Sequence, residues 1–261
     1  MLQVFGHVVR HEKLLEAVYY LTIKVPEIAS VALPGQFVQA RCSEGYAPLL
    51  RKPLSIHEID KQSETISLLY EVKGQGTKLL TNFKSGDTID LIGPLGNGFT
   101  LPQKGKSLLV GGGMGIAPLL PLAQKLMEQG HEFTTILGFN DKERVCRLKA
   151  FQEQGQVIVA TMDGSLGEKG LVTKPLTREL ETGKYSTVYA CGPEGMLKSV
   201  TYIAGKFEIN CQVSLEAYMA CGFGACLGCS CQTETLTGLT YSRVCTEGPV
   251  FNSKEVVWHE S

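Results

Sequence analysis

The sequence lacks any long apolar run and has almost no net charge. Its 261 residues hold nothing close to the roughly 20 apolar residues of a membrane-spanning helix, and no apolar signal segment precedes the first strand-like run. With 25 basic and 26 acidic residues, the formal charge of −1 gives no general attraction to nucleic acid or anionic membranes. We therefore expect a cytoplasmic protein with neither of these as a partner.

The length and composition are those of an ordinary globular protein. Repeats and low-complexity tracts are absent, 43% of the residues are hydrophobic and 20% are charged. A chain of 261 residues can form about two domains, each with its own core. We expect a multi-domain protein that combines α+β and α/β architecture.

Residues 1–102 have the pattern of an antiparallel β domain. Turn residues such as Pro34-Gly35 and Gly96-Asn97-Gly98 separate short alternating or β-branched runs. These runs lie at 6–10, 19–25, 36–41, 54–58, 65–72 and 88–92. Six short strands in one such segment predict a small closed barrel or a sandwich.

Residues 103–210 change to an alternation of strands and helices. The pattern predicts strands at 107–110, 133–138, 157–161 and 187–191, and helices at 118–129, 143–153, 171–181 and 195–206. This alternation predicts βαβ units and a doubly wound parallel sheet. Residues 211–261 are left as a third, smaller domain, which we expect a bound metal to stabilise.

Five of the nine cysteines gather between residues 221 and 245 of this last segment. Cys221, Cys226, Cys229 and Cys245 have the C-x4-C-x2-C…C spacing of a plant-type [2Fe–2S] site. The loop between them holds small residues and glycines, which let backbone N–H groups approach the sulfur atoms of a cluster. Cys231 has no place in this spacing, so we interpret it as a buried packing residue.

Two other uses of these cysteines are open at this point. A structural zinc site could combine Cys226-x2-Cys229 with another cysteine pair, although the four-residue gap after Cys221 and the glycines fit it less well. Disulfides are disfavoured by the expected cytoplasmic location, where thiols stay reduced.

A glycine run marks a candidate nucleotide site in the α/β segment. Gly111-Gly112-Gly113-Met114-Gly115-Ile116-Ala117-Pro118 lies between a predicted strand and a predicted helix, where backbone amides can receive a pyrophosphate. The third glycine of the G-x-G-x-x-G pattern is missing, so a tight turn is the alternative.

Two further strand ends are candidates for the same site. Asp141 follows the second strand, where an acidic side chain binds the adenosine ribose and favours NAD over NADP. The nearby cations Lys142 and Arg144 leave NADP open as the alternative. Cys191-Gly192-Pro193 ends the last strand, at the sheet edge where ligands of doubly wound folds bind.

Two motifs of the β segment together could hold a diphosphate. Arg51-Lys52-Pro53-Leu54-Ser55 places cations and a hydroxyl beside a strand, and Gly76-Thr77 lies at the start of a predicted helix. Taken singly, either motif is more typical of an ordinary turn with a solvated charge.

These motifs, in this order, resemble the ferredoxin–NADP reductase superfamily. The resemblance rests on Arg51-x-Pro53-x-Ser55, Gly76-Thr77, Gly113-x-Gly115-Ile116-Ala117-Pro118, Asp163-Gly164-Ser165 and Cys191-Gly192-Pro193, and it covers nearly the whole chain. Residues 216–229, Glu216-Ala217-Tyr218-Met219-Ala220-Cys221-Gly222-x-Gly224-x-Cys226-x-Gly228-Cys229, are similar to the electron-transfer subunit family of the two-subunit, NAD-linked dihydroorotate dehydrogenases.

The resemblance implies three cofactors and a set of binding residues. FAD would lie in the barrel, NAD on the α/β domain and a [2Fe–2S] cluster on Cys221, Cys226, Cys229 and Cys245. The flavin would be held by Arg51, Lys52, Pro53, Leu54, Ser55, Leu69, Tyr70, Glu71, Gly76 and Thr77. The nicotinamide nucleotide would be held by Gly113, Met114, Gly115, Ile116, Ala117, Pro118, Asp141, Cys191, Gly192 and Pro193.

The same resemblance implies a function in pyrimidine biosynthesis. A separate FMN-containing subunit would oxidise dihydroorotate, in a complex expected to be a heterotetramer. Electrons would then pass through the FMN, the cluster and the FAD to NAD. No side chain is expected to act as an acid or base.

Two other functions compete with this one. The first is a reductase-like subunit of a sulfhydrogenase or of a ferredoxin–NADP transhydrogenase, against which Cys221 argues because several of those relatives have aspartate at this position. The second is a non-catalytic module that is stabilised by zinc or senses redox state.

Overall fold

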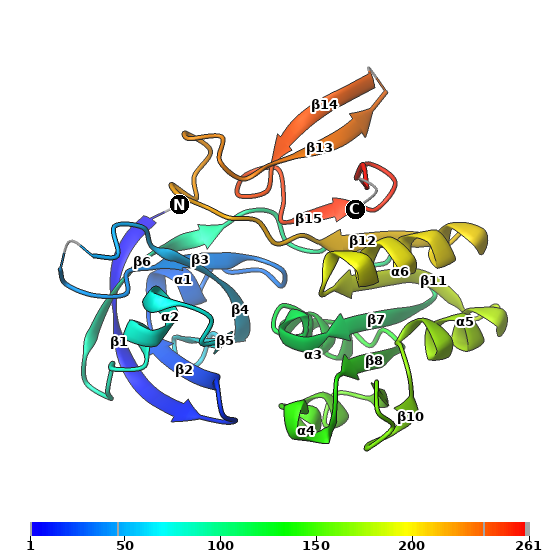
Figure 1. Ribbon diagram of the computed structural model, residues 1–261, viewed down its shortest axis with the longest axis horizontal. Helices are drawn as coiled ribbons and strands as arrows, with labels where there is room; N and C mark the ends of the chain where they lie inside the picture. Colours follow the sequence, from blue (N-terminus) through cyan, green and yellow to red (C-terminus); the bar gives the residue numbers. More distant parts are fainter. Residues whose placement is uncertain (1, 46, 237, 259–261) are drawn as a thin grey trace.

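The computed structural model describes residues 2–45, 47–236 and 238–258, and two large units stand side by side in it (Figure 1). One is a closed six-stranded barrel, and the other is a seven-stranded sheet with helices on both faces. A two-stranded hairpin projects above them. The barrel and the parallel sheet that the sequence predicts are thus both present.

The barrel contains all six predicted strands, in the closed order β1-β2-β5-β4-β3-β6 and antiparallel throughout. Side chains alternate along each strand, so that Val38 and Ala40 of β3 pack inside the barrel while Phe37 packs outside it, against the sheet. The elements are β1 (Leu2–Lys13), β2 (Val18–Lys24), α1 (Pro26–Ala29), β3 (Phe37–Ala40), β4 (Lys52–Asp60), β5 (Thr65–Glu71), α2 (Gln75–Leu80) and β6 (Thr88–Leu95).

The sheet has the order β10-β9-β8-β7-β11-β12-β15 and is parallel except at β15. The chain runs outward from β7 to β10 and returns on the other side of β7 as β11, which makes β7/β11 the switch point. The strands are β7 (Lys106–Gly112), β8 (Phe133–Phe139), β9 (Gln156–Thr161), β10 (Glu168–Lys169), β11 (Tyr185–Cys191), β12 (Asn210–Ser214) and β15 (Val250–Asn252).

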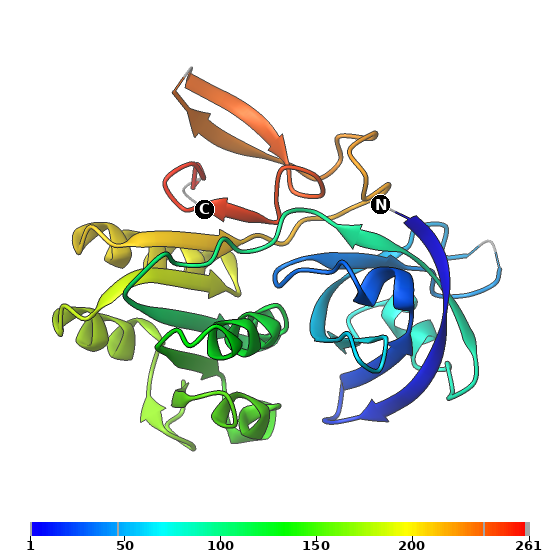
Figure 2. The same ribbon diagram turned by 180° about the vertical axis from the view of Figure 1, so that it is seen from behind.

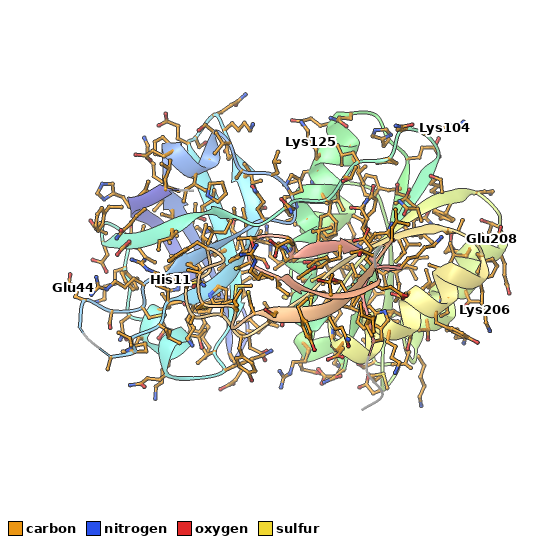
Figure 3. The ribbon with its side chains drawn as sticks, turned by 90° about the horizontal axis from the view of Figure 1, so that it is seen from above. His11, Glu44, Lys104, Lys125, Lys206 and Glu208 are labelled. Atoms are coloured by element: carbon orange, nitrogen blue, oxygen red, sulfur yellow. The ribbon has the colours of Figure 1, made fainter. Side chains whose placement is uncertain are left out.

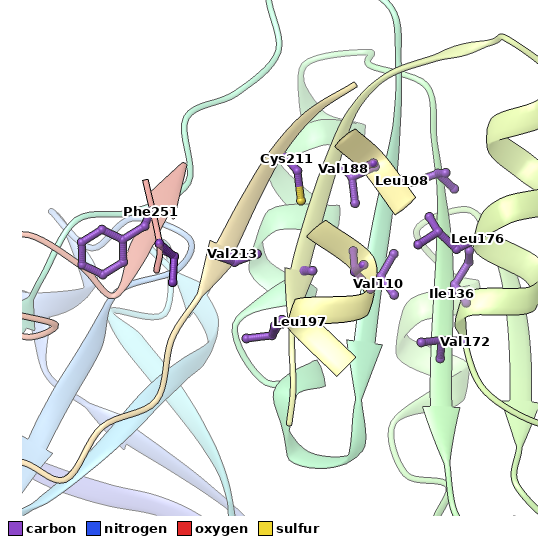
Figure 4. Packing of buried hydrophobic residues seen from close by; sticks show 14 of the residues in the cluster. Leu108, Val110, Ile136, Val172, Leu176, Val188, Leu197, Cys211, Val213 and Phe251 are labelled. Carbon is purple, nitrogen blue, oxygen red and sulfur yellow. The ribbon is translucent and has the colours of Figure 1, made fainter. Parts of the chain in front are cut away.

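Helices cover both faces of this sheet because its strands are apolar on both sides. Figure 4 shows Leu176 and Leu197 packed against Val110 and Val188, in a cluster that extends to Phe251 of β15. The helical elements are η1 (Gly113–Ile116), α3 (Leu119–Glu128), η2 (Lys142–Arg144), α4 (Leu148–Gln152), α5 (Thr173–Glu181) and α6 (Glu194–Lys206), where η denotes a 3₁₀ helix.

The helix predicted at 143–153 is interrupted. The structure has η2 and then α4, separated by Arg147, whose backbone is left-handed with φ of 59°. This conformation is costly for a residue other than glycine. It accompanies hydrogen bonds from the Arg147 side chain to His57 and Glu58 of the barrel, so tertiary contacts outweigh local helix propensity here.

The cysteine-rich segment is tied to the sheet at both ends. β12 pairs with β11, and β15 returns from the segment to pair with β12, so residue 211 lies inside a strand of the sheet. Between these strands lie the cysteine loop and the hairpin of β13 (Ser230–Thr235) and β14 (Gly238–Arg243), seen from behind in Figure 2.

The hairpin lies across the two units when the molecule is seen from above (Figure 3). Glu44 marks the outer margin of the barrel in this view, and Lys206 and Glu208 mark the opposite margin beside α6. Within the described ranges, no helix is both long enough and apolar enough to cross a membrane.

Candidate functional site

A cavity of about 490 Å³ opens at the switch point of the sheet. Gly113, Met114 and Gly115 line it from the end of β7, and Gly192 and Pro193 line it from the end of β11. Ligands of doubly wound sheets bind at this place, outside the carboxyl ends of the strands. Five residues that the sequence assigns to the nicotinamide nucleotide therefore surround one cavity.

Glycine is required where these two loops touch. A Cβ atom on Gly115 would lie 2.3 Å from the carbonyl oxygen of Cys191, and Gly113 has a φ of +53°. The two strand ends approach each other closely because neither loop carries bulk there. The remaining residues of the run lie deeper, since Ile116 is fully buried and Pro118 leads into α3.

Asp141 does not line this cavity. Its carboxylate accepts a 3.0 Å hydrogen bond from the backbone N–H of Arg144 and so caps η2. Its neighbours Asn140 and Arg144 do line the cavity, as does Met162 from the end of β9. The sequence assigned none of these three residues to the site, although it drew attention to Arg144 as a nearby cation and the strand ends were a usable signal for the other two.

A second cavity, of about 210 Å³, lies between the barrel and the sheet. Most of the residues that the sequence assigns to the flavin ring line it, together with Ala117 and Cys191. The assigned residues that line it are Pro53, Leu54, Ser55, Leu69, Tyr70 and Glu71. Phe37, Met219 and Pro249 also line it but were not assigned to the flavin, although Met219 belongs to the motif at 216–229.

The two cavities share part of their lining. Glu71, Lys73, Met114 and Glu216 contribute to both, so a ligand in one cavity reaches the edge of the other. Ala217 and Met219, which also line the second cavity, lead directly into the cysteine loop at Cys221. The structure thus places the predicted nucleotide, flavin and cluster sites next to one another, in that order.

The two cations beside the second cavity are held in place by different contacts. Arg51 forms an ion pair with the buried Asp90, at 2.6 Å between Nη2 and Oδ2, and also donates to the Asp90 backbone carbonyl. Lys52 lies over Gly76, where a Cβ atom would be 2.4 Å from Lys52 Cε. The lysine and the turn of α2 can therefore pack closely only because residue 76 is glycine.

Thr77 closes the same turn on itself. Its hydroxyl accepts hydrogen bonds from the backbone N–H groups of Lys73 and Gly74, and donates to the Gly74 carbonyl. The backbone amides of Lys73 and Gly74 are therefore engaged by Thr77, which fixes the shape of the turn.

The four candidate ligand cysteines lie as two contacting pairs. Cys221 contacts Cys226, and the buried Cys229 contacts the buried Cys245. This grouping fits the chemistry of a [2Fe–2S] cluster, in which four thiolates serve two irons. Among the described residues, no three His, Cys, Asp or Glu side chains converge tightly enough to hold a single metal ion.

The cysteine loop wraps closely around its own sulfur atoms. The backbone N–H of Cys226 donates to Sγ of Cys221 at 3.4 Å, and that of Gly228 donates to Sγ of Cys226 at 3.5 Å. Gly222 and Gly224 have φ of +78° and +87°, in the region that favours glycine.

The surroundings of Cys221 and Cys245 shift the pKa values of their thiols in opposite directions. Burial acts to raise the pKa of Cys221, but hydrogen bonds from backbone N–H groups outweigh it and lower this pKa to about 6. Burial and a hydrogen bond with Cys229 raise the pKa of Cys245 to about 11. Cys221, the less buried of these two residues, therefore favours the thiolate form even before a metal is present.

Two other cysteines lie near these sites. Cys191 is buried at the end of β11, and burial raises the pKa of its thiol to about 12, which keeps it neutral. Cys231 is half-buried in β13 and packs against the main core, in agreement with the packing interpretation of this residue.

Matches to known protein families bear on this arrangement. A family described as the iron–sulfur cluster binding domain of dihydroorotate dehydrogenase B matches residues 216–257. A family described as the oxidoreductase NAD-binding domain matches residues 109–201. The first match contains all four candidate ligands, and the second contains both loops of the larger cavity.

Relatives that match nearly the whole chain identify its family more narrowly. The dihydroorotate dehydrogenase B (NAD(+)) electron transfer subunit of Desulforamulus reducens is 42% identical over 242 residues, covering 92% of each chain. The protein of the same name from a Geobacillus species is 41% identical over 253 residues, covering 96% of each. The chain belongs to this family of electron transfer subunits. The resemblance predicted from the sequence is thereby confirmed.

Solved structures agree with this family. An NADH-dependent reduced ferredoxin-NADP oxidoreductase, studied for flavin-based electron bifurcation, is 34% identical and superposes with a TM-score of 0.88, covering 98% of this chain and 90% of that one. A ferredoxin NADP⁺ reductase from Neisseria gonorrhoeae, 18% identical with a TM-score of 0.64, covers 78% of this chain and 91% of that one and shares the fold. The electron transfer subunit family therefore has the barrel and the nicotinamide sheet of that fold, and the predicted cofactors agree with these matches.

Proposed function

We propose that this chain carries electrons between NAD and a partner subunit that contains FMN and oxidises dihydroorotate, in a heterotetrameric complex. The names of its relatives, as electron transfer subunits of dihydroorotate dehydrogenase B, support a catalytic partner. The observation that carries the proposal is the continuity of the sites, because four residues line both cavities and the second cavity leads into the cysteine loop.

The larger cavity is assigned to NAD. The glycine loop at Gly113–Ile116 and the Cys191-Gly192-Pro193 turn would hold the diphosphate and nicotinamide, as strand ends at a switch point do. Asp141, the cap of η2, would shape the adenosine end together with Asn140 and Arg144. The cationic Arg144 is paired with Glu71 at 3.3 Å, which reduces its availability for a 2′-phosphate and favours NAD.

The second cavity is assigned to the FAD ring. Pro53, Leu54 and Ser55 of β4, and Leu69, Tyr70 and Glu71 of β5, would form its wall. Arg51 and Lys52 with Gly76 and Thr77 would bind the diphosphate, with Arg51 oriented by Asp90. Hydride transfer requires the reacting atoms within roughly 3–3.5 Å, and the shared lining of the cavities supports that contact.

The cysteines Cys221, Cys226, Cys229 and Cys245 are assigned to the [2Fe–2S] cluster. When bound, FAD converts between the hydride chemistry of NAD and the one-electron chemistry of the cluster. This chain's own residues bind and orient these groups and exclude water. Neutral Cys191 and the apolar Met114 would line the region of transfer without exchanging protons.

Anaerobic purification of the chain, alone and with its dihydroorotate-oxidising partner, tests the proposal. We expect one flavin, two irons and two acid-labile sulfides per chain, and NAD-dependent dihydroorotate oxidation only when both subunits are present. A colourless chain without flavin or sulfide would contradict the proposal. Preference for NADPH over NADH would contradict the assignment of the nucleotide.

A further inference from the structure

Gln39 in strand β3 is fully buried, and neither polar atom of its side chain has a hydrogen-bond partner among the described residues. Both Oε1 and Nε2 are affected, so the whole carboxamide is left without a partner. Burying an amide in this state is costly, and buried side-chain amides are nearly always paired. This residue therefore has the properties expected of a group whose partner is a ligand.

The register of β3 shows which face of the barrel Gln39 occupies. Its register neighbours are Pro53 on β4 and Ile92 on β6. Phe37, two positions earlier on the same face of β3, lines the second cavity. Gln39 thus lies on the outer face of the barrel, on the strand that borders the proposed flavin site.

The cysteine loop covers the Gln39 side chain. A Cβ atom on Gly222 would lie 2.6 Å from both Cγ and Nε2 of Gln39, and Gly222 has a φ of +78°. Gly222 directly follows Cys221, the first proposed cluster ligand. The amide therefore points at the loop that wraps the sulfur atoms, and that loop can lie on it only because residue 222 has no side chain.

We propose that the Gln39 carboxamide donates an N–H hydrogen bond to a sulfur atom of the iron–sulfur group and acts as a positioning residue between the barrel and the cluster. The proposal rests on the assignment of the cluster to this loop. Hydrogen bonds to sulfur are one of the means by which a protein sets a cluster's reduction potential. An N–H donor stabilises the more negative, reduced form, so Gln39 raises that potential.

This role would couple two sites that are far apart in the sequence. Gln39 is anchored in the strand beside the proposed flavin, while its amide contacts the loop of the cluster. A change in the position of β3 would therefore alter the environment of the cluster directly. The barrel would contribute to the cluster without contributing a ligand.

Glutamine labelled with ¹⁵N only in its side-chain amide tests the contact in the native chain. After reduction of the cluster with dithionite, electron–nuclear double resonance should detect one coupled ¹⁵N nucleus. The same labelled preparation of Gln39→Met, which keeps an unbranched side chain but has no donor, should lose this coupling. Gln232→Met, in β13 of the same segment, serves as the matched control and should keep it.

Potentiometry provides the second measurement. We expect Gln39→Met to retain its iron and sulfide, to show a lower cluster potential and to leave the flavin potential unchanged. A wild-type chain that holds the cluster but shows no ¹⁵N coupling would overturn the inference, as would a cluster potential that does not move. A wild-type chain without iron and sulfide would instead contradict the proposed function. If Gln39→Met fails to assemble, the coupling in the wild-type chain alone decides the matter.

Discussion

Arg147 donates a 3.0 Å hydrogen bond from Nε to Nε2 of the buried His57, and this contact joins the α/β unit to the barrel. His57 Nδ1 donates in turn to the carbonyl of Ala117 at 2.9 Å, at the end of the glycine run. Arg147 also pairs with Glu58 at 2.6 Å. The strand assigned to the flavin is therefore fixed to the loop assigned to the nicotinamide.

Replacing Arg147 should weaken this contact between the α/β unit and the barrel. Arg147→Ala removes an ion pair whose side chains are each 22% exposed, and it leaves the Nε2 of His57 without its donor. We expect the free energy of unfolding to fall by about 1–3 kcal/mol, since buried groups would lose their partners. Denaturant unfolding of the holoprotein measures this change.

An exposed ion pair in the same unit serves as the control. Arg178 pairs with Glu168, and the arginine side chain is 50% exposed. Arg178→Ala should cost about 0–1 kcal/mol, as exposed ion pairs do. Equal losses in the two variants would show that the contact with His57 contributes nothing beyond an ordinary surface pair.

His57 should make stability depend on pH. Burial is the main cause that lowers its pKa from 6.5 to about 3, so the folded protein keeps it neutral while the unfolded chain protonates it below about pH 6.5. Its contribution to stability is complete above that pH and is lost progressively as the pH falls toward 3, by up to about 1.4 kcal/mol per pH unit. When urea unfolding is measured at a series of pH values, the free energy of unfolding should fall less steeply with decreasing pH for His57→Gln than for the wild-type protein. Parallel curves for the two proteins would refute this assignment.

Gly115 should control nucleotide binding. In Gly115→Ala the new methyl group would meet the Cys191 carbonyl oxygen at 2.3 Å, so the two loops of the larger cavity must separate. We expect KM for NADH to rise at least tenfold while the flavin content stays unchanged, as measured with an artificial electron acceptor. Gly205→Ala, where a Cβ meets nothing within 4 Å on α6, should bind NADH as the wild-type protein does. An unchanged KM in Gly115→Ala would contradict the assignment of this cavity.

The ligand set predicts different results for two neighbouring cysteines. Cys229→Ser should abolish iron and sulfide binding, because it breaks the buried pair with Cys245. Cys231→Ser, two residues later in β13, should keep the cluster and its electron paramagnetic resonance spectrum. Loss of the cluster from Cys231→Ser would show that the spacing selects the wrong thiol.

The sequence predicted the features that depend on local patterns. The six barrel strands follow from alternation, and the loop at Gly113–Ile116 follows from glycines at the boundary between a strand and a helix. The sheet switch point then places that loop beside Cys191, because βαβ units wind with a constant hand.

The features that it did not predict arise from contacts across the chain. Nothing near Arg147 signals a left-handed backbone, which the partners on β4 account for. The three-residue strand Val250–Asn252 is too short for any periodicity and exists because β12 offers a free edge. Gln39 is one polar residue in an apolar strand, and its burial depends on a loop about 180 residues away that folds over it.

The return of β15 to β12 has a consequence for the repair of the protein. Because adjacent strands lie about 4.8 Å apart, the two ends of the cysteine segment stay close together whether or not iron is bound. The pairing of β12 with β15 already closes this loop, so metal binding does not have to offset the entropic cost of closing it. We therefore expect a chain that has lost its cluster to keep the two ends of this segment together and to take up a new cluster without global unfolding.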